Sequence, residues 1–150
     1  MSRRRIKTTR GAQRPFRFYI ASLGCPKNTV DSNAMAVLLE RAGLQSTLDA
    51  SAADLVIVNT CGFIADARQE SLDTLESVAS SLGPSQKLVA AGCWAQRAPQ
   101  ALAEAVPRIN ALLGTRSWAQ IVSVAKDLLS SPGQATRSLI EDRLTPDIIA

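Results

Sequence analysis

The sequence predicts a three-layer α/β fold, in which an open, largely parallel sheet of about five strands is covered by helices on both faces. Two observations favour this class. Residues 55–59, LVIVN, form an apolar and β-branched run without alternation, which is typical of a strand buried on both faces of a parallel sheet. Such runs alternate along the chain with stretches of helical periodicity, the pattern of parallel strands joined by crossover helices. The 150 residues suffice for one domain with its own hydrophobic core.

The first half of the chain contains two further strands and one helix. Residues 16–22 are predicted to form a strand, and SLGCPKN is predicted to form a loop. Apolar positions then recur at helical spacing over 30–42, where Asn28 or Asp31 is suited to cap the start of a helix and Gly43 is suited to end it. A short strand at 44–48 is expected before the buried strand at 55–59.

The second half repeats this alternation. A helix is predicted over 65–82, with one apolar face and a stop at Gly83-Pro84, followed by a strand at 87–91. Residues 99–105 form a helix with Pro99 in its first turn, 109–113 form a short strand, and 118–129 form the last helix. The turn at 114–117, GTRS, suits either an ordinary helix cap or an anion at a helix start.

The net charge of +4 comes from the amino-terminal arm. Seven of the seventeen basic residues precede residue 18, so ten basic and thirteen acidic residues remain, a net charge of −3. We therefore expect residues 1–15 to form a basic disordered arm, which either contacts RNA phosphates weakly or stays solvated.

No apolar run approaches the roughly 18 to 20 residues that cross a membrane, and no leader segment is evident. The expectation is a soluble, cytoplasmic protein.

The chain contains no histidine. This excludes the commonest general base, the nucleophile pairs that depend on imidazole, and zinc sites with imidazole ligands. Any chemistry must therefore use thiolates, carboxylates, lysine or a bound cofactor.

The three cysteines share one setting. Each follows an apolar run and has a glycine beside it: Gly24-Cys25, Cys61-Gly62 and Gly92-Cys93. Ligands of open α/β sheets bind beyond the carboxyl ends of strands, and all three cysteines are predicted to lie there, none inside a helix. Glycine lets the backbone approach a bulky ligand, and Pro26 favours an extended Cys25. We expect the three sulfurs to converge and to hold an iron–sulfur cluster.

Other uses of three cysteines remain open on the residues alone. Each cysteine is also an ordinary small core residue, and Cys25 near a helix start is also a candidate reactive thiol. Disulfides fit an odd cysteine count poorly, structural zinc normally takes four ligands, and three thiolates are an unusual catalytic zinc site. A 4Fe-4S cluster is normally held by cysteine thiolates, and three of them would leave one iron open to an outside ligand.

Four stretches carry a more specific inference: SLGCPKNTVDSNAM, VNTCGFIADARQESLDT, AAGCWAQR and LLGTRSW. Together they resemble the amino-terminal domain of the methylthiotransferases, radical S-adenosylmethionine enzymes that insert a methylthio group into an unactivated carbon–hydrogen bond. The resemblance covers residues 16–129. It implies that Cys25, Cys61 and Cys93 bind an auxiliary 4Fe-4S cluster whose open iron carries the transferred sulfur. It assigns no catalytic side chain to this chain.

The CPKN and CGFI variants together with QESLD resemble the branch that modifies the β-carbon of an aspartate in a small-subunit ribosomal protein. The alternative branch acts on isopentenyladenosine in tRNA, and an aromatic content of 4% provides little surface for stacking RNA bases. An alternative of another class is a non-catalytic iron–sulfur binding or interaction module.

Family members continue into a barrel domain whose CxxxCxxC motif binds a second 4Fe-4S cluster and S-adenosylmethionine. This sequence contains no CxxxCxxC, and its RSLIEDRLTP is similar to the hinge that leads to the barrel. We therefore expect residues 130–150 to be a linker toward a radical S-adenosylmethionine domain acting in cis or in trans, and the chain to be inactive alone.

Several side chains near these motifs have two interpretations. Lys27, Asn28 and Asp31 are placed to hydrogen-bond a cluster or the moving methylthio group, although helix capping explains Asn28 and Asp31 equally well. Trp94 and Trp118 suit either a domain boundary or the core.

Overall fold

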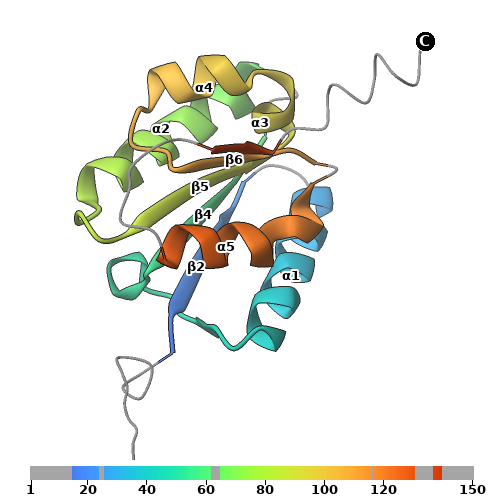
Figure 1. Cartoon of the computed structure of the whole chain (residues 1–150). Helices are drawn as coiled ribbons and strands as arrows, with labels where there is room; N and C mark the ends of the chain where they lie inside the picture. Colours follow the sequence, from blue (N-terminus) through green and yellow to red (C-terminus); the bar gives the residue numbers. More distant parts are fainter. Residues whose placement is uncertain (1–14, 24–25, 62–64, 116, 131–136, 140–150) are drawn as a thin grey trace, which may run out of the picture.

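The computed structural model describes residues 15–23, 26–61, 65–115, 117–130 and 137–139 (Figure 1). Its centre is one sheet in which every neighbouring pair of strands is parallel, in the order β3-β2-β4-β5-β6-β7. The strands are β2 (Arg17–Ser22), β3 (Gln45–Ser46), β4 (Leu55–Thr60), β5 (Lys87–Gly92), β6 (Ala111–Leu113) and β7 (Arg137–Leu139). The predicted parallel α/β class is confirmed.

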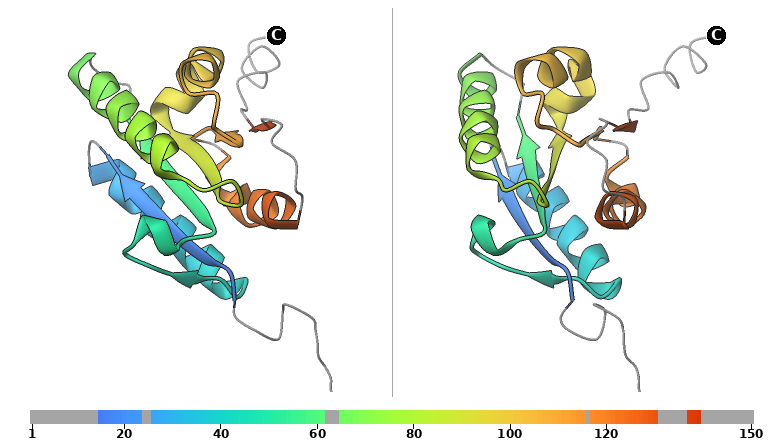
Figure 2. Two further views of the ribbon diagram at one scale, coloured as in Figure 1. Left: turned by 90° about the vertical axis from the view of Figure 1, so that its left-hand side faces the viewer. Right: turned by 60° about the vertical axis from the view of Figure 1, so that its left-hand side comes forward.

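Helices cover both faces of the sheet, as the two views of Figure 2 show. One face carries α1 (Pro26–Arg41) and α5 (Ile121–Ser130), and the other carries α2 (Ala65–Ser81), α3 (Cys93–Arg97) and α4 (Pro99–Ala105). Two short 3-10 helices, η2 (Ala50–Ala52) and η3 (Trp118–Gln120), complete the described elements. The three layers follow directly from this arrangement.

The central strands β4 and β5 are buried along their whole length. In β4, Leu55 and Ile57 pack toward α1 and α5, whereas Val56 and Val58 pack toward α2, α3 and α4. Both faces of the strand therefore meet helices, which explains why its sequence is continuously apolar. The interpretation of LVIVN as a buried strand is confirmed.

The strand order reverses between β2 and β4, which makes this the topological switch point of the sheet. From β2 the chain passes through α1 on one face to the edge strand β3, and from β4 it passes through α2 on the opposite face to β5. Loops that leave neighbouring strands toward opposite faces open a crevice at the carboxyl ends, which is the usual ligand position in open α/β sheets. The fold thus predicts a site beyond Ser22 and Thr60, the last residues of β2 and β4.

Helix α1 differs from its prediction at its start. It begins at Pro26 rather than near residue 30, because proline is tolerated in a first turn and the CPKN segment runs straight into the helix. Asn28 is consequently inside the first turn and buried, so its predicted role as a helix cap is wrong. The predicted end is confirmed: Gly43 has φ +101°, and the N–H of Leu44 donates to Leu39 O at 3.1 Å.

Other boundaries moved for local reasons. The second strand is limited to Gln45–Ser46, because Leu48 is 99% exposed and belongs to no strand. The last predicted helix begins as η3 before it becomes α5, and β6 begins at Ala111, after the buried Ile109 and Asn110. The helix at Pro99–Ala105 is found as predicted, whereas β7 and α3 were not predicted.

None of the helices in the described part of the chain is both long enough and apolar enough to span a membrane.

Candidate metal centre

Two of the three cysteines directly follow paired residues at the carboxyl edge of the sheet. Cys61 follows Thr60, the end of β4, and Cys93 follows Gly92, the end of β5. Thr60 and Gly92 are paired residues of these neighbouring strands. Both cysteines are thiols. The edge that is predicted to carry the site therefore carries these two cysteines.

Cys25 lies outside the described residues, and so do Gly24 and Gly62. The chain on either side of Cys25 is described, and it meets the end of β4. The Leu23 N–H donates to Asn59 O at 3.1 Å, and α1 starts at Pro26. The convergence of three sulfurs stays a prediction.

Cys61 is held by the helix that follows it. Ser71, buried in α2, accepts a hydrogen bond from the Cys61 N–H at 2.9 Å and donates its hydroxyl to Cys61 O at 3.1 Å. Both backbone polar groups of Cys61 are thereby satisfied by one side chain, and the residue is 6% exposed. The backbone after β4 is consequently fixed against α2.

Cys93 is the first residue of α3, so the expectation that no cysteine lies inside a helix is wrong for this one. The helix starts at once after β5 because Gly92 adopts φ +98° and ψ −164°, which turns the chain sharply. Cys93 is half-buried, and its Sγ lies 4.0 Å from Asn28 Oδ1, within the range of a weak S–H···O hydrogen bond.

Gly92, the residue before Cys93, must be glycine because neighbouring protein atoms leave no room for a side chain. A Cβ at Gly92 would lie 2.4 Å from Asn59 Oδ1 and 2.4 Å from Thr60 O, far inside normal contact distances. The sequence suggested that this glycine makes room for a ligand. The structure shows that it makes room for the buried side-chain amide of Asn59.

Asn28 and Asn59, which we call the asparagine pair, join the start of α1 to the ends of the strands. Each is 1% exposed. Asn28 Nδ2 donates to Leu23 O at 2.6 Å and to Thr60 O at 2.8 Å, and lies 3.3 Å from Asn59 O. Asn59 Nδ2 donates to Asn28 O at 3.0 Å and to Ser32 Oγ at 2.9 Å. The pair thus bonds α1 to the chain at the carboxyl ends of β2 and β4.

Sequence reasoning singled out Asn28 but missed its partner Asn59 and missed Ser71. A signal was present: Asn59 and Thr60 end an otherwise apolar buried strand, and polar groups in such a place must find partners within the protein. Thr60 Oγ1 does so by donating to Ala91 O at 2.6 Å. Of the two interpretations of Asn28, the helix cap is wrong because α1 starts at Pro26, four residues before the predicted start, and the hydrogen bond to a cluster stays a prediction.

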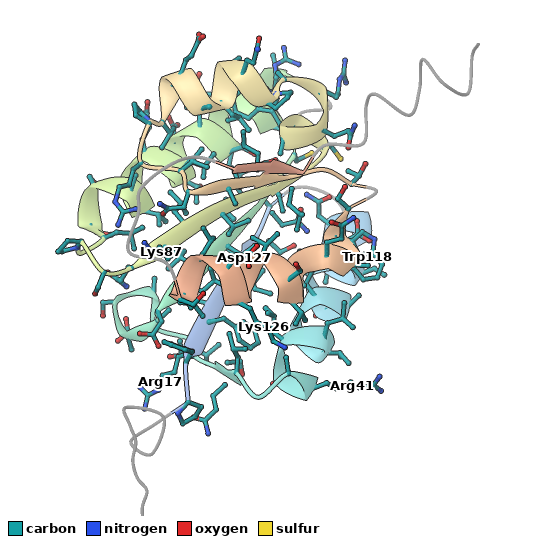
Figure 3. All side chains as sticks on the ribbon, viewed as in Figure 1. Arg17, Arg41, Lys87, Trp118, Lys126 and Asp127 are labelled. Carbon is teal, nitrogen blue, oxygen red and sulfur yellow. The ribbon has the colours of Figure 1, made fainter. Side chains whose placement is uncertain are left out.

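The remaining candidate residues lie around this centre without joining it. Trp94 and Trp118 are half-buried and pack against the two cores, and Trp118 lies where η3 meets α1 (Figure 3). Ser117 precedes η3 but makes no side-chain cap, and its buried hydroxyl has no partner within the described part of the chain. Arg116 and the side chain of Lys27 are outside the described residues, and Asp31 is half-buried in α1.

The donor set available here consists of thiols. Among the described residues, no three histidine, cysteine or carboxylate side chains are grouped closely enough to hold a metal ion. Cys61 and Cys93 place two thiols at adjacent strand ends, and Cys25, which follows β2 in the sequence, is the remaining cysteine of the chain. An all-thiolate set is the usual one for iron–sulfur clusters, so the residues present fit such a group.

Comparison with known proteins places this edge in a wider context. The profile of the Uncharacterized protein family UPF0004 matches residues 17–114, which include all three cysteines. Curated relatives include the "Ribosomal protein uS12 methylthiotransferase RimO" of Roseiflexus sp. (strain RS-1), 48% identical over 122 residues, which are 81% of this chain and 26% of the relative.

Two relatives of the same name are more distant. The protein of Chloroflexus aurantiacus is 46% identical over 112 residues, 75% of this chain and 24% of its own length. The protein of Anaeromyxobacter sp. (strain Fw109-5) is 39% identical over 135 residues, 89% of this chain and 27% of its own length. The chain therefore spans about a quarter of the length of the curated relatives it matches.

Proposed function

We propose, from the fact that this chain belongs to the UPF0004 family, that it is the auxiliary-cluster, sulfur-donor domain of a methylthiotransferase acting on ribosomal protein uS12. The observation that carries the proposal is the position of Cys61 and Cys93 just after paired ends of neighbouring strands, at the carboxyl edge of the sheet. The expected resemblance to methylthiotransferases agrees with the names of the relatives.

Cys25, Cys61 and Cys93 would hold a 4Fe-4S cluster. Bound by three thiolates, such a cluster supplies an iron with a vacant coordination position that can carry the sulfur to be transferred. The residues around the cysteines would hold the backbone of the site in place. Ser71 fixes the backbone of Cys61, Gly92 turns the chain into Cys93, and Asn28 bonds the start of α1 to the end of β4.

The proposed substrate is the β-carbon of an aspartate in uS12, and the proposed site of action is the cytoplasm, where ribosomes are found. The second 4Fe-4S cluster and S-adenosylmethionine belong to a radical domain supplied in cis or in trans, since the cysteines of CxxxCxxC are not in this sequence. Weak contact of the basic arm at 1–15 with RNA remains part of the proposal. The uS12 names of the relatives favour the protein substrate over a tRNA nucleotide.

The cluster is tested by loading the full 150-residue chain anaerobically and measuring bound iron and acid-labile sulfide. We expect about four of each per chain, and we expect Cys61→Ala to lose them, because a cluster with only two protein thiolates is poorly held. Ser123→Ala, on an exposed position of α5, serves as the control and retains the full content. Bound zinc, or no metal, would contradict the proposal.

Sulfur donation is tested separately from cluster binding. The loaded chain is mixed with a separately produced radical S-adenosylmethionine domain, reductant, S-adenosylmethionine and uS12, and the substrate is analysed by mass spectrometry. A methylthio adduct on an aspartate that depends on the loaded chain supports the donor function. A fully loaded chain that never yields the adduct identifies a non-catalytic iron–sulfur module instead.

A further inference from the structure

Asn28 lies in the first turn of α1, three residues after Cys25 in the sequence, and is 1% exposed. Its Nδ2 group donates to Leu23 O, just beyond β2, and to Thr60 O, at the end of β4. One amide group therefore joins three segments: the start of a helix and the ends of two strands. Cys61 directly follows one of these ends.

The orientation of this amide is determined by its surroundings. The carbonyl oxygens of Leu23, Asn59 and Thr60 lie 2.6, 3.3 and 2.8 Å from Nδ2, so this atom must be the donor nitrogen. The other atom, Oδ1, is then an acceptor, and it lies 4.0 Å from Cys93 Sγ. Asn28 thus contacts the backbone before Cys61 with one end and the thiol of Cys93 with the other.

We propose that Asn28 is a positioning residue for the thiolate site, an inference that rests on the proposed function. It holds the segment that follows Cys25 at a set distance from the strand ends that carry Cys61 and Cys93. Asn59, in β4, supports this arrangement because its Nδ2 group donates to Asn28 O at 3.0 Å. Gly92 permits it, because any side chain there would occupy the space of the Asn59 amide.

A second buried asparagine offers a matched comparison. Asn110 is 0% exposed, and its Oδ1 accepts from the Leu88 N–H and from Arg108 Nη1, each at 2.9 Å. It precedes β6 and bonds the start of β5, so it lies at the amino edge of the sheet, opposite the cysteines. Replacing Asn110 disturbs a buried hydrogen-bond network of similar kind without touching the proposed site.

The experiment compares Asn28→Ala, Asn110→Ala and Asn33→Ala in the full chain, the last at an exposed position of α1. The first readout is the rate at which a chelator removes iron from the loaded chain, with the electron paramagnetic resonance spectrum of the reduced cluster beside it. We expect about tenfold faster loss and an altered spectrum for Asn28→Ala, the lower end of effects seen for residues that orient metal ligands. The other two variants should match the unaltered chain.

The second readout needs no cluster. Alkylation of Cys93 by iodoacetamide is followed by peptide mass spectrometry in the metal-free chain, and we expect it to be several-fold faster in Asn28→Ala alone. If the unaltered chain binds no iron, the proposed function fails, and the alkylation rates still decide the role of Asn28. Equal alkylation in Asn28→Ala and Asn110→Ala would overturn the inference, as would unchanged iron loss in a loaded chain. Should Asn28→Ala not fold, Asn28→Ser is compared in the same way.

Discussion

Gly92 shapes the candidate site through both its backbone conformation and the space around it. Its backbone, at φ +98° and ψ −164°, lies in a region that glycine occupies almost alone. A Cβ added to Gly92 would lie 2.4 Å from Asn59 Oδ1 and 2.4 Å from Thr60 O. Strand β5 can therefore end in a sharp turn that places Cys93 next to Asn28.

We predict that Gly92→Ala loses about 2 to 6 kcal/mol of stability, because a side chain in this backbone region costs about 1 to 3 kcal/mol and overpacking costs about 1 to 3 kcal/mol. Equilibrium unfolding in urea measures the loss. Gly83→Ala is the control: its added Cβ would meet Gln86 Oε1 at an ordinary 3.7 Å, and we expect a change within about 0.5 kcal/mol. Equal stabilities of the two variants would show that the crowding at Gly92 is absent in solution.

The sequence was a good guide to which residue types matter and a poor guide to what they contact. Cys61 and Cys93 were placed at strand ends because a cysteine after a buried apolar run is visible in one dimension. The partnership of Asn28 with Thr60 and Cys93 joins residues 32 and 65 positions apart, and no local pattern reports such a pairing. For Asn28, local patterns therefore indicate only its neighbours in the sequence, which are Cys25 and a helix start.

Among the elements, helix α1 carries the candidate site at one end and a well-defined stop at the other. At the stop, the N–H of Gly43 donates to Glu40 O and the N–H of Leu44 donates to Leu39 O, each at 3.1 Å. These two bonds satisfy carbonyls that the end of a helix leaves without partners, and they require the left-handed backbone at Gly43. Leu44 then enters the core.

We predict that Gly43→Ala destabilises the chain by about 1 kcal/mol, the lower end of the cost of a left-handed backbone for a residue with a Cβ. No atom lies within 4 Å of the added Cβ, so the cost is conformational and not steric. Gly43→Asn should lose less, because asparagine tolerates this conformation. Thermal unfolding of the three chains measures the order, and a neutral Gly43→Ala would contradict the proposed helix ending.

Elements with a strong apolar signal were predictable, and elements held by their neighbours were not. Strands β4 and β5 and helix α4 were found where the pattern placed them, because burial on both faces or a first-turn proline leaves a local trace. Strand β7 has three residues and is defined by pairing with β6, and β3 has two. Helix α3 starts where it does because of the turn at Gly92, and the pattern of apolar residues does not report backbone dihedral angles.

Across the whole molecule, the candidate site is separate from the cores that stabilise the fold. One core lies between the sheet and α1 with α5, and the other lies between the sheet and α2, α3 and α4. Among the described residues, Cys61 and Cys93 belong to neither cluster, although Cys61 is itself buried. Cys61 and Cys93 follow the last residues of their strands, at the carboxyl edge, whereas Lys87 marks the start of β5 at the opposite edge (Figure 3).

This separation predicts that the chain stays folded without a cluster. Removing the metal with a chelator under reducing conditions should leave the far-ultraviolet circular dichroism unchanged and urea unfolding cooperative, with the same dependence on denaturant, because the apolar surface buried in the two cores does not change. The loaded chain should be more stable only by the free energy of binding to the folded state. Small domains built around a metal unfold when it is removed. Loss of cooperative unfolding here would mean that the cluster, and not the two cores, organises the sheet edge, and that the asparagine pair cannot hold that edge alone.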